Sequence, residues 1–489
     1  MKKKGIIICS ILLMLGLTAC AGSKEDSVAK KEQEKVSEAI GKTGREKVVE
    51  SAKEGDLQTE EFEIAIETVP YEKSMYLNDD ILLFELKWDR PVLSGSGAEG
   101  LAAINEAFEK EMEETIAVLT QDEVDEESYM SFYALAKEQY AEREAMAAEM
   151  GEELFFNPFS YQMSYHMQRA DDKVITFTSA ECSYMGGAHG GNLVTGINYD
   201  AQTGKLLTLD DVCTDKEGFL QVSREEIVRQ IEEMRGHDPY LFFEEYEKYV
   251  SDVFQEGCWY LKESGVSWIS REYTLQPYAA GTIEFTIPYK MLEGCMDSAY
   301  FTPEEVQEVS AAKEAATKIL TDVVDWAGLK FLYGEKVEQE ELSPESVAGM
   351  MGKVISYTGS ANSRIDEENY NMIIPMEDLI EKSTLYFEKD LLTGAVLDIH
   401  KLEALGIEMT DEGHLAVGYG DWGLSTPRFR ITDAEKTGED SYRIAVEYYM
   451  YDYETSTDSE VRATADYEIV KDSRGRYGYL IRDMKMTVK

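Results

Sequence analysis

The 489-residue sequence has only five histidines and six cysteines. It contains no H-E-x-x-H or C-x-x-C pair for zinc, no G-x-S-x-G elbow for a nucleophilic serine and no Walker loop for a nucleotide phosphate. Its acidic residues are too numerous for any pair to stand out as a catalytic acid and base. The sequence therefore predicts no catalytic residue, no metal site and no cofactor.

Basic residues are also scarce, because 48 Lys and Arg face 96 Asp and Glu and give a formal net charge of −48. Binding to nucleic acid needs basic patches that displace counterions, so a nucleic acid is excluded as a partner. The acidic field attracts cationic proteins, peptides or metal ions, or it serves solubility alone. Since 43% of the residues are hydrophobic, the chain can bury sizeable cores, and its length suggests two or three domains.

The apolar run at residues 6–17 is too short for a stable membrane span. It follows three lysines and ends in Leu-Thr-Ala-Cys at residues 17–20, which is typical of a secretory signal. This ending resembles the lipobox of bacterial lipoproteins, in which the cysteine is lipidated and becomes the first mature residue. We expect a signal peptide over 1–19 and acyl chains on Cys20 that hold the protein on the outer face of a bacterial membrane. An ordinary signal with a chance cysteine is the alternative.

Residues 20–58 are rich in Lys, Glu, Ser and Ala and poor in large apolar side chains. Such a segment cannot bury enough surface to offset its chain entropy, so we expect a flexible charged tether.

Four cysteines follow the tether, Cys182, Cys213, Cys258 and Cys295. An exported chain permits disulfides, but four cysteines allow three pairings that the sequence does not distinguish. Buried thiols and one or two bridges both remain open.

The body after the tether alternates between helical and strand patterns. Apolar residues at spacings of three and four predict a helix that packs by one stripe, formed by Leu101, Ile104, Phe108, Met112 and Ile116. A helical pattern is also expected at 122–150. A further helical pattern is expected over 223–256, with an interruption at 236–239. Ile283, Phe285 and Ile287 alternate with polar residues, which is typical of a half-covered antiparallel sheet. The fold class is therefore α+β, with antiparallel sheets and packed helices.

Gly95, Gly97 and Gly100 form a G-x-G-x-x-G between a strand and a helix, the order of a dinucleotide-binding fold. Pro91 precedes the motif, and no second parallel strand with an acidic end is recognisable after it. We therefore do not assign a nucleotide site here.

A second α+β domain is expected at 336–489, after a connecting helix at 299–335. Thr302-Pro303 and Ser343-Pro344 are typical helix starts. Two long alternating segments, 442–450 and 461–469, predict strands. Helices followed by a meander of long strands resemble the cone-shaped fold of the NTF2-like superfamily, on element order alone.

Three segments in sequence order carry a more specific resemblance. They are the glycine-rich "SYMGGAHGGN" at 183–192, the hairpin "NYDAQTGKLLTLDDV" at 198–212 and "GVSWISREYTLQPYAAGTIEFTIPYKML" at 265–292. This set resembles the extracellular domain of the anti-sigma-V factor (RsiV) family, which also precedes the catalytic domain of PdaC-type peptidoglycan deacetylases. The stretch "WDRPVLSGSGAEGLAAINEAF" at 88–108 is similar to the smaller domain that accompanies it. The expected parts are 59–181 and 182–298, with the resemblance covering about 61–292.

The resemblance implies a binding ectodomain, because in the anti-sigma factors this module binds lysozyme, a cationic protein. Only residues 1–4 would face the cytoplasm, so we expect no sigma factor to be bound by this chain. No deacetylase domain is recognisable after the module. The expected function is recognition of an envelope or host-derived ligand, such as lysozyme, peptidoglycan or another glycan. An enzyme or enzyme accessory in peptidoglycan modification and a structural envelope protein are the alternatives.

The candidate ligand face combines the glycine run with aromatic residues of the third segment. Its residues are Tyr184, Gly187, His189, Asn192, Trp268, Tyr273 and Tyr278. The competing interpretation is structural: glycines allow positive φ in a tight corner between strands, and aromatic residues at strand spacing are often core. Acidic runs leave weak calcium binding open, although no EF-hand spacing is present.

Overall fold

The structure is a computed structural model that describes residues 47–48, 62–123, 131–333, 339–418, 425–452 and 457–489. The chain divides into two compact units, residues 1–301 and residues 302–489, which are described separately below. The signal peptide, Cys20 and nearly all of the expected tether lie outside the described residues. Within the tether range, Lys47–Val48 forms a short strand, β1.

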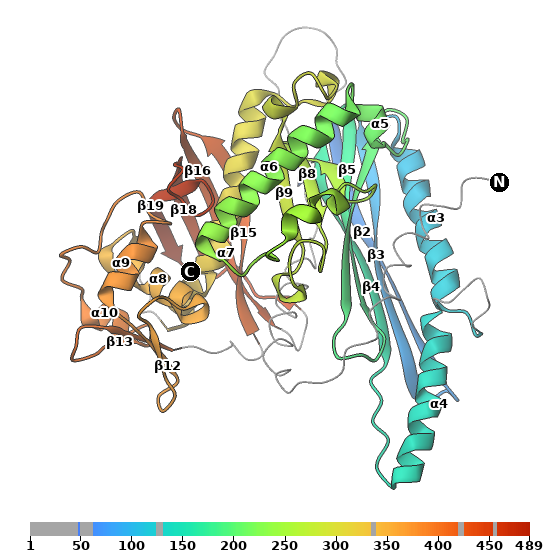
Figure 1. Ribbon diagram of the computed structural model, residues 1–489, viewed down its shortest axis with the longest axis horizontal. Coiled ribbons are helices and arrows are strands. Elements are labelled where there is room, and N and C mark those ends of the chain that lie inside the picture. Colours follow the sequence, from blue (N-terminus) through green and yellow to red (C-terminus); the bar gives the residue numbers. More distant parts are fainter. Residues whose placement is uncertain (1–46, 49–61, 124–130, 334–338, 419–424, 453–456) are drawn as a thin grey trace. The chain divides into compact units, whose positions relative to one another are not determined.

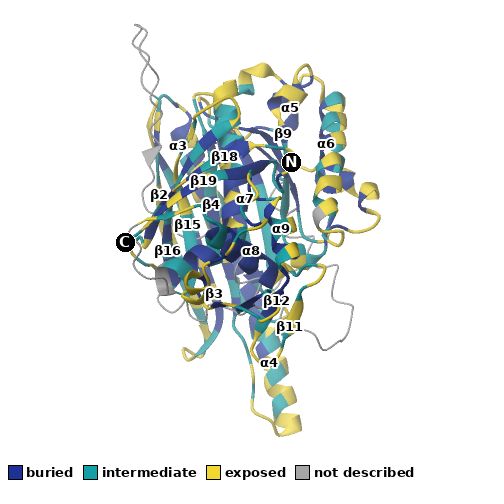
Figure 2. Ribbon diagram, turned by 90° about the vertical axis from the view of Figure 1, so that its left-hand side faces the viewer, coloured by how far each residue is buried: buried dark blue, intermediate teal, exposed yellow. Residues whose placement is uncertain are grey.

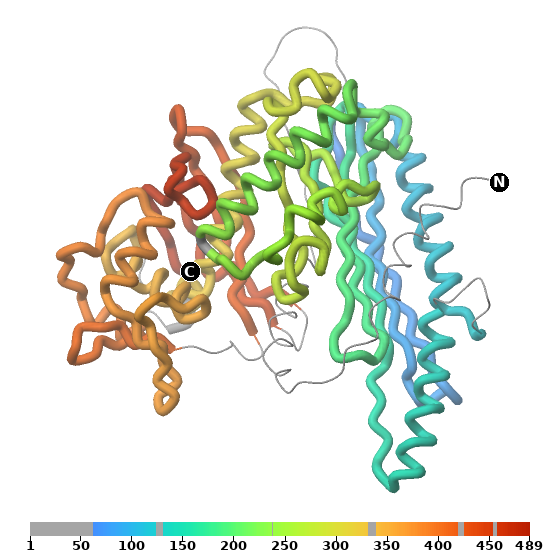
Figure 3. Tube along the Cα trace, in the orientation of Figure 1, coloured from blue at the N-terminus to red at the C-terminus, as the bar shows by residue number. Residues whose placement is uncertain are grey.

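A six-stranded sheet in the order β1-β2-β3-β4-β5-β6 forms the centre of the first unit (Figure 1). All pairings are antiparallel except that of β3 with β4, which is parallel. This exception arises because two helices cross over between these two strands, whereas short connections join β2 to β3, β4 to β5 and β5 to β6 (Figure 3). The strands are β2 (Glu63–Leu77), β3 (Ile81–Ser96), β4 (Phe159–Ala170), β5 (Val174–Tyr184) and β6 (Gly191–Asp200). The expected border at 181/182 falls inside β5.

Helices α3 (Leu101–Leu119) and α4 (Phe132–Met150) pack on one face of this sheet. The predicted stripe of α3 faces the sheet, and Phe108 is fully buried. Its ring contacts those of Tyr165 and Phe177 with centroid distances of 4.9 and 5.1 Å. At the start of α3, a Cβ on Gly100 would lie 2.3 Å from the backbone nitrogen of Gly204. A close approach of two backbones therefore accounts for this glycine of the G-x-G-x-x-G.

A smaller layer packs on the opposite face of β5 and β6. It contains the three-stranded sheet β7-β8-β9 and the helices α5 and α6. Thr176 on β5 donates its hydroxyl to the carbonyl of Leu261 (2.8 Å). The buried Asn198 on β6 donates to the carbonyl of Trp259 (3.2 Å) and accepts from the amide of Leu261 (2.8 Å). These bonds join the two layers through buried polar groups rather than through apolar contacts alone.

The elements of this layer have the following bounds: α5 (Leu209–Val212), α6 (Lys216–His237), η2 (Tyr246–Lys248), η3 (Val250–Val253), β7 (Trp259–Leu261), β8 (Gly265–Ser270), η4 (Tyr278–Ala280), β9 (Ile283–Pro288), η5 (Tyr289–Leu292) and η6 (Ser298–Tyr300). The helical pattern expected up to residue 256 therefore ends at His237, and only short 3-10 turns follow it. Phe285 and Ile287 are buried, as the alternation of β9 predicts. The α+β prediction is confirmed.

The second unit holds a long helix, α7 (Glu304–Tyr333), against an antiparallel sheet in the order β10-β19-β18-β16-β15. The expected connecting helix thus belongs to this unit, since Val323 and Trp326 are fully buried in its core. Helices followed by a meander are present as predicted, and Tyr442, Ile444 and Val446 are buried. The NTF2-like assignment stays a prediction.

A second, four-stranded sheet in the order β11-β12-β14-β13 was not expected from the sequence. The remaining elements of this unit are α8 (Pro344–Thr358), α9 (Met376–Ser383), α10 (Ile399–Glu403), β10 (Glu340–Glu341), β11 (Arg364–Asp366), β12 (Asn371–Ile374), β13 (Ile407–Met409), β14 (Leu415–Gly418), β15 (Ser425–Lys436), β16 (Ser441–Asp452), β17 (Thr457–Asp458), β18 (Ala463–Lys471) and β19 (Tyr479–Val488).

All four cysteines of the body are free thiols. Cys258 and Cys295 are buried, whereas Cys182 and Cys213 are half-buried. Burial raises the pKa of the Cys213 thiol to about 12, with a smaller contribution from the neighbouring Cys295. Such thiols are poor nucleophiles at neutral pH. Over the described residues, every helix is too short or too polar to cross a bilayer.

Candidate functional site

The glycine run forms the connection between β5 and β6. Gly186 has a φ of 78°, and a Cβ there would lie 2.2 Å from the side-chain oxygen of Gln139 on α4. A Cβ on Gly190 would lie 2.7 Å from the carbonyl of Ser183, whereas one on Gly187 would meet nothing closer than 3.7 Å. Packing and turn geometry therefore account for two of the four glycines of the run, Gly186 and Gly190.

His189 lies at the exposed tip of this connection and begins a row of three rings. Its imidazole packs on Tyr278 with ring centroids 4.2 Å apart, and Tyr278 stacks on Tyr273 at 5.6 Å. The Tyr278 hydroxyl donates to the carbonyl of Gly190 (2.8 Å), which fixes the row to the glycine connection. Two segments about 85 residues apart in sequence are thereby combined into one surface.

The loop at residues 271–281 holds Tyr273 in an unusual backbone conformation. Tyr273 has a φ of 64°, and its side chain is 50% exposed. The buried Gln276 fastens the loop by donating to the carbonyls of Ser270 (3.0 Å) and Gly281 (2.8 Å). A left-handed conformation at a bulky residue costs free energy, and such residues cluster at functional sites.

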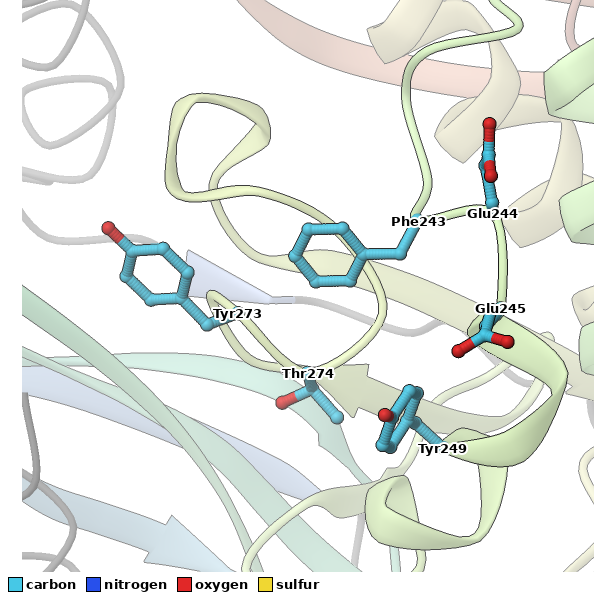
Figure 4. Close-up of a pocket in the computed structure, with 6 residues that line it drawn as sticks. All are labelled: Phe243, Glu244, Glu245, Tyr249, Tyr273 and Thr274. Atoms are coloured by element: carbon cyan, nitrogen blue, oxygen red, sulfur yellow. The ribbon is translucent and has the colours of Figure 1, made fainter.

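An open hollow of about 400 Å³ adjoins Tyr273. It is lined by Phe243, Glu244, Glu245, Tyr249, Tyr273 and Thr274. Figure 4 shows the rings of Phe243, Tyr249 and Tyr273 around Thr274, with the Glu245 carboxylate beside Tyr249. The amide of Phe243 donates to the carbonyl of Leu275 (2.9 Å), which ties the two lining segments together. Glu245 forms an ion pair with Lys248.

A carboxyl group also lies beside the row of rings. Asn192 donates its side-chain amide to Glu272 (3.3 Å). Burial raises the pKa of Glu272 to about 7, and the bond from Asn192 and the nearby His189 only partly oppose this. The negative charge of this surface therefore increases as the pH rises through neutrality.

We call this surface the acid-aromatic face. It comprises His189, Asn192, Phe243, Glu244, Glu245, Tyr249, Glu272, Tyr273, Thr274 and Tyr278.

The structure thus brings together four of the seven candidate residues, His189, Asn192, Tyr273 and Tyr278. Trp268 does not belong to the face, because it is fully buried and its ring packs edge-on against Phe254 at 4.8 Å. It is a core residue of β8. Tyr184 ends β5 opposite Ser160 and is half-buried. Gly187 is exposed in the connection.

Sequence reasoning missed Glu272 and every lining residue of the hollow except Tyr273. A usable signal was the run "YLFFEEYEKY" at 240–249, in which aromatic and acidic residues follow the helix interruption at Pro239. This run was assigned to the helical pattern expected over 223–256, which gave it no place on a ligand surface, and its partner loop is about thirty residues away.

Two further carboxyl groups lie between α3 and the large sheet. Glu111 accepts from the hydroxyl of Tyr165 (3.1 Å), and Glu181 accepts from that of Tyr161 (3.1 Å). Burial raises the pKa of Glu111 to about 7 and also raises the pKa of Glu181. Neither residue lines the hollow. In the described part of the chain, no group of three His, Cys, Asp or Glu residues is arranged to hold a metal ion.

Comparison with known families matches two parts of the first unit. Residues 76–192 match the family described as "Deacetylase PdaC", and residues 210–290 match the one described as "Protein of unknown function (DUF3298)". The two matches confirm the resemblance of this region to a module of the RsiV and PdaC type. Together they span less than half of the chain, and no curated protein matches it.

Two solved structures are similar to this chain. A DUF3298 family member from Bacteroides fragilis NCTC 9343 is 17% identical with a TM-score of 0.35, and the match covers 48% of this chain and 96% of that one. A DUF3298 family protein from Pseudomonas aeruginosa PAO1 is 15% identical with a TM-score of 0.32, and the match covers 49% of this chain and 97% of that one.

Proposed function

We propose that this chain is a lipid-anchored surface protein that binds a cationic extracellular protein through the acid-aromatic face. The observation that carries the proposal is the open hollow, whose lining includes three aromatic rings and two glutamates, with the Glu245 carboxylate beside Tyr249. Monomeric proteins rarely expose aromatic rings in such a cluster unless it binds something.

The shape of the face favours binding over catalysis. The hollow is open to solvent, whereas a catalytic site needs a pocket that holds a substrate against acid, base or nucleophilic groups. The carboxyl groups of Glu111, on α3, and Glu181, on β5, do not line the hollow. The face offers rings and charges for recognition but no acid-base pair positioned in the hollow.

The chemistry of the face suits lysine and arginine side chains. A cation over an aromatic ring gains roughly 0.5–2 kcal/mol, and carboxylates at the rim add charge-assisted hydrogen bonds. The net charge of −48 steers a cationic protein toward the whole molecule. Lysozyme, the ligand implied by the resemblance to anti-sigma-V factors, is a cationic protein.

A glycan is the second candidate. The planes of Tyr273 and Tyr278 are inclined by only 25°, so the two rings form a stacked platform. Flat platforms of this kind also bind sugar rings, which connects the face to peptidoglycan. Salt separates the two candidates, because it weakens the binding of a cationic protein and leaves stacking on a neutral sugar almost unchanged.

The anchoring part of the proposal depends on Cys20. The signal sequence and the lipobox-like ending support a lipid there and a location on the outer face of the membrane. Replacing Cys20 by serine is expected to release the protein from the membrane fraction and to abolish its labelling by a fatty-acid analogue. Unchanged labelling of the variant would show that the lipid is attached elsewhere or that the anchor is of another kind.

The binding test uses hen egg-white lysozyme and a neutral wall disaccharide as probes. Tyr273→Gly removes the ring but keeps the positive φ, which glycine adopts without strain. We expect it to weaken lysozyme binding about tenfold, the loss typical of an aromatic anchor. Tyr240→Ala, at a side chain that is 89% exposed and outside the hollow, is the matched control. Equal binding by both variants, or turnover of peptidoglycan by the purified protein, would refute the proposal.

A further inference from the structure

The end of α4 carries apolar side chains that contact little of the first unit. Met146, Met150 and Phe155 are 60%, 64% and 70% exposed. Figure 2 shows this end of α4 largely in the colour of exposed residues, and in Figure 3 the chain turns back there toward β4. Met146 and Met150 are four positions apart and therefore lie on one face of the helix.

The local structure holds these side chains in place. Gly151, with a φ of 67°, ends the helix and reverses the chain. Arg143 then donates to the carbonyls of Phe155 (3.3 Å) and Gly186 (3.3 Å). The ring of Phe156 packs edge-on against Tyr140 at 5.4 Å. These hydrogen bonds and this ring contact hold the turn that carries the exposed methionines and Phe155 in one conformation.

The segment that carries these apolar side chains is also rich in exposed glutamates, which we call the glutamate rim. Residues 141–155 contain one basic residue, Arg143, and five exposed glutamates: Glu142, Glu144, Glu149, Glu152 and Glu153. We call residues 141–155 the α4 tip. Large apolar side chains exposed close together in one segment indicate an interaction site, and unbranched methionine side chains adapt to varied partners.

We propose that the α4 tip is a docking surface for a basic amphipathic helix of a partner protein. Such a helix would place its apolar side on Met146, Met150 and Phe155 and its lysines or arginines against the glutamate rim. A second copy of this chain would bring the same acidic rim against itself, and an anionic lipid surface would also be repelled. This surface is separate from the acid-aromatic face, and its role does not depend on the function proposed for that face.

The experiment uses the full chain in detergent and an 18-residue amphipathic peptide of leucine and lysine as the probe. The double variant Met146→Gln, Met150→Gln removes the apolar contact while keeping the side-chain length. We expect the dissociation constant for the peptide to rise about tenfold or more, the effect of losing one to two buried large side chains. Met291→Gln, at a methionine that is 43% exposed elsewhere in the unit, is expected to change it less than twofold.

Two further measurements decide among the possible occupants. In spectra of methyl-labelled methionine, the resonances of Met146 and Met150 are expected to shift on peptide addition, and Tyr273→Gly is expected to leave this shift unchanged. Sedimentation and flotation with phosphatidylglycerol vesicles test self-association and lipid binding. The proposal is overturned if the wild-type chain does not bind the peptide, if Met291→Gln weakens binding as much as the double variant, or if the double variant instead abolishes a dimer or vesicle binding.

Discussion

The buried carboxyl group of Glu111 makes the stability of the first unit depend on pH. Burial raises its pKa from 4.5 to about 7, so between these values the folded state holds a proton that the unfolded state has lost. The free energy of unfolding must therefore fall as the pH rises from about 4.5 to about 7. Above that range, the folded state carries the full cost of ionising a buried carboxyl group. Below pH 4.5 the group is protonated in both states, so its burial adds no ionisation cost to folding.

The size of this penalty follows from the shift. About 1.4 kcal/mol for each pKa unit gives a ceiling of about 3 kcal/mol, and partial contact with water reduces the expected value to about 2 kcal/mol. Glu111→Gln stays neutral at every pH, and its amide oxygen still accepts the hydroxyl of Tyr165. We expect this variant to gain about 2 kcal/mol over the wild type at pH 8 and almost nothing at pH 4.

Urea unfolding at both pH values, followed by tryptophan fluorescence, measures the difference. Glu113→Gln, at an exposed position of the same helix, is the control for changing the net charge. The reasoning is refuted if Glu111→Gln and Glu113→Gln shift the unfolding midpoint equally at pH 8, or if the gain from Glu111→Gln is the same at both pH values.

Three other expectations follow from the packing of the first unit. Gly196→Ala should destabilise it by about 2 kcal/mol or more, because a Cβ there would lie 2.2 Å from the carbonyl of Trp259, whereas Gly187→Ala should leave the melting temperature almost unchanged. Trp268→Ala should cost about 3–5 kcal/mol in chemical unfolding, since the side chain is fully buried, and a surface role would instead leave stability intact. The thiol of Cys258 should react with iodoacetamide only after unfolding, because it is buried and its pKa is raised by that burial; rapid labelling of the native protein would contradict this.

The periodicity of apolar residues predicted those helices and strands that have one face on the core and the other in solvent. The stripe that contains Phe108 and the alternation of Phe285 and Ile287 were both recognisable, because a burial pattern repeats with the geometry of the element. The parallel pairing of β3 with β4 was not, because it depends on how two helices return the chain over the sheet. No local pattern encodes that return path.

The candidate site was only half predictable for a related reason. Aromatic residues at strand spacing serve either a core or a surface, and the sequence alone did not separate Trp268, which is buried, from Tyr273, which is exposed. Phe243 lies beside Tyr273 because its backbone amide bonds to the carbonyl of Leu275, about thirty residues away in sequence. Glu111 is one of 96 acidic residues, and its burial follows from its place beside the apolar stripe of α3.

Asn198 lies in neither of the two segments that match known families, yet its side chain hydrogen-bonds to both ends of β7 in the second of them while its backbone pairs with β5 in the first. A fragment that ends between Asn198 and β7 would leave this amide without its partners and expose the surface that β7 covers. We therefore expect the two segments to fold together as one unit, because the link between them lies outside both.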